Sequence, residues 1–196
     1  MTTQDTAETA ALIKDLASAF VARPRDVEIG YQQAESGETY LALKGHPEDE
    51  SRLIGKAGSH VKALTFLVGR FGRAAGRVYT FRLITEQAPR ARLEQEPRNA
   101  VTYDPQAAKG LLERLLEALE LGEYAVTVGP GIGPRHYLNF VFKVHVRFRT
   151  DYAYLITPDN PQLASDMTVV GAIGTIFRAI AKQAGVRFTL IVEEPQ

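Results

Sequence analysis

The sequence predicts an α/β protein, more narrowly an α+β arrangement, built from two similar units. Amphipathic helical segments alternate along the chain with short strands of β-branched and aromatic residues. An aliphatic pair followed by Gly-x-x-Gly occurs at corresponding places in the two halves, at residues 53–58 and 169–174, and a third copy at residues 67–72 does not fit this layout. A stretch rich in Pro, Gln, Arg and Glu with little periodicity separates the halves. We therefore expect a first domain at residues 1–88, a linker at 89–103 and a second domain at 104–196.

The first domain is expected to follow the order α-β-β-α-α-β. Its helices are predicted at residues 6–22, from residue 47 to the first glycine pair, and directly behind Gly58. Its strands are predicted at residues 27–31, 39–43 and 78–84, the first two joined by a turn. This order favours a three-stranded sheet with three helices on one face.

The second domain repeats this layout with additional residues before its last helices. Helices are predicted at residues 106–121, 162–170 and 175–184, and strands at 124–128, 140–149, 152–157 and 186–192. Residues 53–58 align with residues 169–174, and the two closing strands also resemble each other. We interpret the second half as a diverged internal repeat.

Composition excludes several classes of protein. The 196 residues are 45% hydrophobic and 23% charged, as in a globular protein, and the formal net charge is zero. Nucleic-acid binding would therefore depend on local charge. The absence of cysteine excludes disulfides and thiolate metal sites. Because no apolar run could span a bilayer and the first residues lack signal-peptide features, we expect a cytoplasmic protein without a membrane partner.

No catalytic motif is present. The glycine-rich segment 129–134 is not followed by Gly-Lys-Ser/Thr, so it is not a phosphate-binding P-loop. The four histidines lack metal-ligand spacing, and there is no Gly-x-Ser-x-Gly elbow. We expect no enzyme activity, no catalytic residues, no metal and no cofactor.

The strongest functional signal is the segment at residues 55–58, which we call the glycine loop. Gly55 and Gly58 let the main chain approach a ligand closely because they lack a Cβ atom, and Lys56 adds a positive charge between them. An amphipathic helix begins directly behind the loop, and a helix N-terminus attracts anions. These features suit a sugar-phosphate chain.

The charge around the glycine loop supports the same interpretation. Residues 51–85 contain no acidic side chain. They contain seven basic ones, Arg52, Lys56, Lys62, Arg70, Arg73, Arg77 and Arg82. A locally basic region on a neutral protein is what binding to a phosphate backbone requires.

Residues 10–85 resemble the small bacterial KH protein family, which has a type II KH fold. The resemblance rests on residues 20–27, 46–49 and 53–64, and the glycine loop is its most specific part. It implies that the loop holds the backbone of single-stranded RNA while the bases lie in an apolar groove. The predicted RNA-binding residues are Ile54, Gly55, Lys56, Ala57, Gly58, Ser59, His60, Lys62, Arg73 and Arg77. Among them, Ile54 lines the groove, and Arg73 and Arg77 are predicted at its second wall.

The second half departs from this pattern. The Gly171–Gly174 segment has no cation, which leaves open whether it binds anything. Lys143, His145, Arg147 and Arg149 share one face of a predicted strand. Lys143, Arg147 and Arg149 form a possible secondary RNA surface, or belong to a sheet face kept soluble by charge.

The sequence therefore predicts an RNA-binding protein that acts in post-transcriptional regulation or RNA processing. One alternative is a protein-interaction or assembly module, in which the second half forms a homodimer or docks onto another RNA-binding protein. A further alternative is a ribosome-associated factor. The RNA target, the partner and the oligomeric state stay open.

Overall fold

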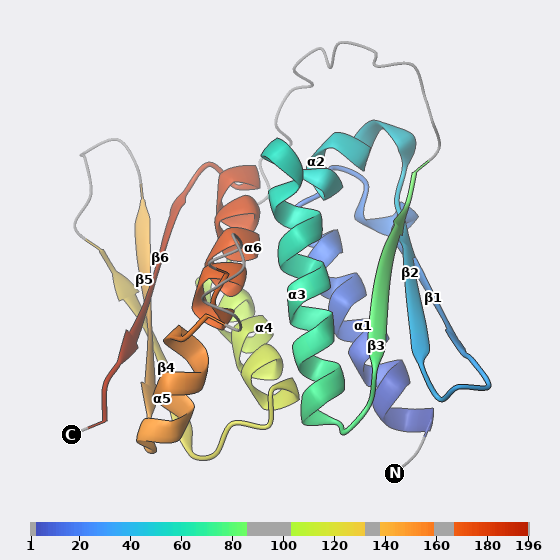
Figure 1. Cartoon of the computed structure of the whole chain (residues 1–196). Coiled ribbons are helices and arrows are strands. Elements are labelled where there is room, and N and C mark those ends of the chain that lie inside the picture. The colour runs from blue at the N-terminus through green and yellow to red at the C-terminus, as the bar shows by residue number, and fades with distance from the viewer. Residues whose placement is uncertain (1–2, 86–102, 132–137, 159–166, 196) are drawn as a thin grey trace. The chain divides into compact units, whose positions relative to one another are not determined.

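The computed structural model describes residues 3–85, 103–131, 138–158 and 167–195 of the chain (Figure 1). They form two compact units, Met1–Thr102 and Tyr103–Gln196, called unit 1 and unit 2 below. Most of the predicted linker lies outside the described residues. Among the helices of the described segments, none has the length and apolar character needed to cross a membrane. The fold is α+β, with one three-stranded mixed sheet in each unit.

Unit 1 has the element order α-β-β-α-α-β. Its helices are α1 (Thr3–Ser18), α2 (Glu50–Ile54) and α3 (Ser59–Ala74). Its strands are β1 (Glu28–Gln33), β2 (Thr39–Lys44) and β3 (Tyr79–Ile84). Single 3₁₀ turns at Pro24–Asp26, Pro47–Asp49 and Lys56–Gly58 complete the connections.

The sheet of unit 1 has the strand order β1-β2-β3, with β1 antiparallel to β2 and β2 parallel to β3. Leu41 pairs with Phe81, and both are buried, as is Leu43. These side chains share one face because residues two apart in a strand point to the same side. Helices α1 and α3 cover that face (Figure 1), so the core of unit 1 lies between them and the sheet.

Gly72 sets how closely α3 approaches the turn into β3. A Cβ atom at this position would lie 2.9 Å from the carbonyl oxygen of Arg77 and 3.0 Å from the main-chain nitrogen of Tyr79. Both atoms belong to the backbone and cannot move aside like a flexible side chain. Glycine is therefore required for α3 to pack directly against β3.

Unit 2 has its own sheet with the same pairing pattern. Its elements are α4 (Pro105–Ala118), β4 (Tyr124–Pro130), β5 (Asn139–Val146), α5 (Arg149–Ile156), α6 (Val169–Gln183) and β6 (Arg187–Glu193). Strand β4 is antiparallel to β5, and β5 is parallel to β6. The Phe188 ring lies 4.9 Å from the Phe142 ring and 5.1 Å from the Phe177 ring of α6, centroid to centroid. These aromatic contacts fasten α6 to the sheet.

Three predictions for unit 2 are wrong. The predicted strand 152–157 is part of helix α5, because a short apolar segment fits either periodicity. Strand β5 ends at Val146, before the predicted residue 149. The predicted break at Gly171–Gly174 does not exist, because α6 runs continuously from Val169 to Gln183. Part of the predicted helix at 162–170 lies outside the described residues.

The two glycines within α3 should respond in opposite ways to alanine. We expect Gly72→Ala to lower the free energy of unfolding by about 2 kcal/mol, because the new methyl group meets backbone atoms. Gly69→Ala serves as the matched control, since nothing lies within 4 Å of its Cβ position. This variant should raise the free energy of unfolding by about 0.5–1 kcal/mol, because alanine has a higher helix propensity than glycine. Urea unfolding of both variants measures the difference, and equal effects would contradict the close packing of α3 on β3.

Tyr103 should make unit 2 sensitive to alkaline pH. Its ring packs 5.3 Å from Phe140, burial raises the pKa of Tyr103 to about 12, and its buried hydroxyl has no hydrogen-bond partner among the described residues. Because the pKa is higher in the folded than in the unfolded chain, the folded state favours the neutral phenol. The stability that depends on this neutral form is complete below about pH 10 and is lost as the pH rises towards 12. Tyr103→Phe should therefore gain about 1 kcal/mol of unfolding free energy at pH 7 and lose less stability between pH 9 and 11. Thermal melts at these pH values test this, and a destabilised variant would contradict it.

Candidate nucleic-acid interface

The glycine loop has an unusual backbone conformation. Three of its four residues adopt positive φ angles, 74° at Gly55, 53° at Ala57 and 76° at Gly58. Glycine reaches this region at little cost, whereas Ala57 is strained by about 1–2 kcal/mol. The side chains of Lys56 and Ala57 are exposed to solvent. The turn therefore presents these two residues outwards, directly before the first turn of α3.

His60 supports the glycine loop from behind. Its Nδ1 lies 2.6 Å from the carbonyl oxygen of Arg52, and its ring packs edge-on against Phe20 with 5.3 Å between centroids. A Cβ atom at Gly55 would lie 2.6 Å from Cγ of His60 and 2.8 Å from Oγ of Ser59. Gly55 is therefore required both by its backbone angle and by the imidazole packed against it.

Asp49 fixes α2, the helix that leads into the glycine loop. Its carboxylate is almost completely buried and accepts hydrogen bonds from the main-chain N–H groups of Ala22 and Arg23, at 3.0 and 2.9 Å. It also pairs with Nη1 of Arg52 at 2.9 Å. These contacts join the segment after α1 to α2. Sequence analysis missed this role, because an acidic residue in the first turn of a helix is usually solvated and stabilised by the helix dipole.

Most of the residues predicted to bind RNA lie together at this end of unit 1. Ile54 is half-buried at the end of α2, and Ser59 and Lys62 lie in the first turn and a half of α3. The Cε atom of Lys62 lies 3.6 Å from the Cβ position of Gly58. The exposed Lys56 and Lys62 therefore place two positive charges on and beside the loop. His60, by contrast, has its Nδ1 and its ring in contact with Arg52 and Phe20.

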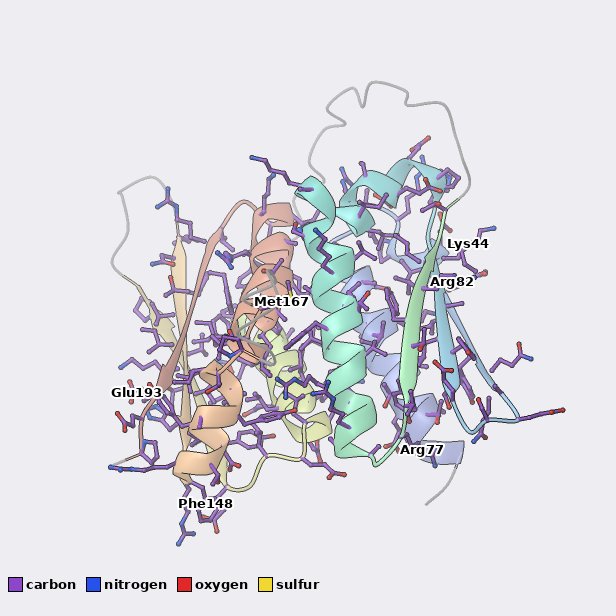
Figure 2. The ribbon with its side chains drawn as sticks, in the orientation of Figure 1. Lys44, Arg77, Arg82, Phe148, Met167 and Glu193 are labelled. Carbon is purple, nitrogen blue, oxygen red and sulfur yellow. The ribbon has the colours of Figure 1, made fainter. Side chains whose placement is uncertain are left out.

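Arg73 and Arg77 are not brought to the glycine loop. Helix α3 has 16 residues, and Arg73 lies near its far end, about 21 Å along the axis from Ser59 at 1.5 Å per residue. Arg77 follows the helix and donates a hydrogen bond from Nη1 to Oγ1 of Thr6, at 2.9 Å. In Figure 2, Arg77 lies at the opposite end of unit 1 from α2. The sequence places both arginines soon after the glycine loop along the chain. It does not show that the straight helix between them carries the two residues to the far end of unit 1.

The predicted basic face of unit 2 is smaller and more neutral than expected. Lys143 and His145 share the outer face of β5, but Nζ of Lys143 and Nδ1 of His145 each lie 2.8 Å from a carboxylate oxygen of Glu193 on β6. Arg147 pairs with Glu123. Arg149 belongs to the first turn of α5, so its predicted place on the strand face is wrong. The hydrogen bond from Lys143 lowers the pKa of Glu193, which stays ionised beside these bases.

The Gly171–Gly174 segment of unit 2 does not form a loop. Gly171 and Gly174 lie inside α6, whose first turn is capped by Thr168, with its Oγ1 accepting from the N–H of Gly171 at 2.9 Å. A serine or threonine cap continues into a regular helix. The backbone that makes residues 55–58 a candidate site is therefore not repeated here.

Removing the Asp49 carboxylate should destabilise unit 1 strongly. Asp49→Ala leaves two main-chain donors and Arg52 without their shared acceptor, so we expect a loss of about 3 kcal/mol in unfolding free energy. Glu48→Ala is the matched control, because its ion pair with Arg23 is exposed and should contribute no more than about 1 kcal/mol. Urea unfolding of the full chain measures both changes. Similar small losses would show that Asp49 does not hold α2 in place.

Searches against protein-family models, curated proteins and solved structures find no match for this chain. A function for this chain therefore has to be inferred from the geometry of the glycine loop, the charge around it and the sequence resemblance described above.

Proposed function

We propose that unit 1 binds single-stranded RNA by holding its sugar-phosphate backbone against the glycine loop. The observation that carries this proposal is the run of positive φ angles at Gly55, Ala57 and Gly58, with Lys56 exposed among them. This turn lies directly in front of a 16-residue helix. The element order and strand pairing of unit 1 are compatible with the type II KH fold that its sequence resembles.

The proposed contact is electrostatic and depends on main-chain atoms. A phosphate placed before α3 meets the partial positive charge of the helix N-terminus, and Lys56 and Lys62 add full charges. At Gly58 no Cβ atom stands between a ligand and the backbone, whereas the Cβ side of Gly55 is filled by His60 and Ser59. The half-buried Ile54 gives the adjoining surface an apolar component on which a base can rest.

The small number of cations predicts weak binding with a shallow salt dependence. For single strands, a plot of log affinity against log salt concentration has a slope of about −0.7 for each phosphate that the protein neutralises. Two lysines therefore give a slope of about −1.4. Backbone contacts do not read sequence, so base preference should be loose. A second bound module would raise the overall affinity through avidity.

The test is charge reversal at the tip of the loop. Lys56→Asp/Ala57→Asp replaces a cation by two anions at exposed positions, so we expect at least a tenfold loss of affinity for mixed single-stranded RNA and a shallower salt slope. Fluorescence anisotropy across a salt series measures both quantities, and circular dichroism checks the fold. A parallel series with single-stranded DNA measures the preference for RNA.

The matched control is Ser36→Asp/Arg73→Asp, which makes the same change in net charge. Ser36 lies in the turn between β1 and β2, and Arg73 lies at the far end of α3. This variant should bind RNA almost as the original protein does. Unchanged affinity and salt slope in a folded loop variant, or an equal loss in the control, would refute binding at the glycine loop.

A further inference from the structure

His60 joins the two helices on either side of the glycine loop. It lies in the first turn of α3, and its Nδ1 lies 2.6 Å from the main-chain carbonyl oxygen of Arg52, in the last turn of α2. A carbonyl oxygen only accepts, so Nδ1 of His60 donates this hydrogen bond. The last carbonyl groups of a helix have no partner within that helix, and His60 supplies one for Arg52. One side chain therefore connects the segments before and after the loop.

The imidazole ring also fills the space on one side of the loop. The Cβ position of Gly55 lies 2.6 Å from Cγ and 2.8 Å from Nδ1 of His60. The ring packs edge-on against the buried Phe20, with 5.3 Å between centroids. Gly55 is the residue at which the chain leaves α2, with a φ angle of 74°. The ring, in contact with both Phe20 and Gly55, therefore supports the turn at its first residue.

The turn needs this support because part of it is strained. Ala57 adopts a φ angle of 53°, which is unfavourable for a residue that has a Cβ atom. The main-chain N–H of Gly58 closes the turn by donating to the carbonyl oxygen of Gly55 at 3.1 Å. A strained residue persists only where the surrounding structure holds it. Without His60 we expect the turn to adopt other conformations, in which Lys56 and the main chain are no longer placed for a phosphate.

We propose that His60 is a positioning residue for RNA binding. Its hydrogen bond to Arg52 holds residues 55–58 in the conformation that receives a phosphate, and its side chain acts on the RNA without contacting it. The inference rests on the proposed function and replaces the direct RNA contact that the sequence predicts for His60. A pre-formed loop raises affinity, because the apparent dissociation constant increases as the fraction of molecules in the binding conformation falls.

The experiment compares His60→Ala and His60→Asn with the unaltered protein by fluorescence anisotropy across a salt series. Alanine removes the hydrogen bond and the ring, whereas asparagine keeps an N–H donor close to the position of Nδ1. We expect His60→Ala to lose about tenfold in affinity for mixed single-stranded RNA, the change in population that corresponds to one strained residue. His60→Asn should lose only about threefold, because it keeps the hydrogen bond. The salt slope should not change, since the phosphates meet the same lysines.

Amide hydrogen exchange in the absence of RNA measures the turn directly. The N–H of Gly58 is protected while the turn is closed, so in His60→Ala it should exchange about tenfold faster relative to the amides of β2, which report the stability of unit 1. Thr65→Ala is the matched control, because it also removes a hydrogen bond from a side chain of α3 to a main-chain carbonyl, in this case that of Val61 at 2.8 Å. The control should change neither the exchange at Gly58 nor the affinity for RNA.

The outcomes distinguish this inference from the proposed function. If RNA binding depends on Lys56 but His60→Ala binds as tightly as the unaltered protein, the role of His60 is overturned and the proposed function stands. A shallower salt slope in His60→Ala overturns it as well, because His60 then acts as a charged contact. Equal losses in His60→Ala and His60→Asn, or unchanged exchange at Gly58, also contradict it. If no Lys56-dependent binding occurs, the proposed function fails and this inference fails with it.

Discussion

The buried carboxylate of Asp49 is the interaction on which the functional end of unit 1 depends. It satisfies main-chain donors in the segment after α1 and the guanidinium of Arg52 in α2. Helix α2 has only five residues and no side-chain cap, so it cannot be stable alone. Its position, and that of the loop that follows, comes from this tertiary contact. The main-chain carbonyl of Arg52 then receives His60, which extends the same network to the first turn of α3.

The order of elements in unit 1 could be predicted because helix and strand periods are local properties of the sequence. The glycine pair and the amphipathic helix behind it placed the loop correctly between α2 and α3. The features that could not be predicted depend on which residues distant in sequence lie close together in the fold, and on how far apart sequence neighbours are placed. Arg73 follows the loop closely in a basic run of sequence, yet a straight helix carries it to the other end of the unit. The burial of Asp49 and the support from His60 involve residues 26 to 40 positions away, for which no local pattern exists.

Unit 2 shows why a repeated motif does not guarantee a repeated structure. Its sheet pairs as that of unit 1 does, since alternating apolar residues specify strands wherever they occur. The segments at residues 55–58 and 171–174 differ because Thr168 caps α6 before the glycines, whereas α2 ends at Ile54, directly before Gly55. Glycine permits a turn but does not impose one. Likewise, the alternating cations of β5 predicted a charged strand face, but their acidic neighbours Glu193 and Glu123 come from other parts of the chain.

The support behind the glycine loop has a consequence for how the loop can vary. Its backbone is specified by Gly55, His60 and Asp49, while its outward chemistry is specified by residues 56 and 57, which are exposed to solvent. Shape and surface charge are thus encoded at separate positions. Substituting residues 56 and 57 should change which ligands the loop attracts while its backbone stays the same. The glycine loop is therefore a suitable place to engineer a new ligand preference.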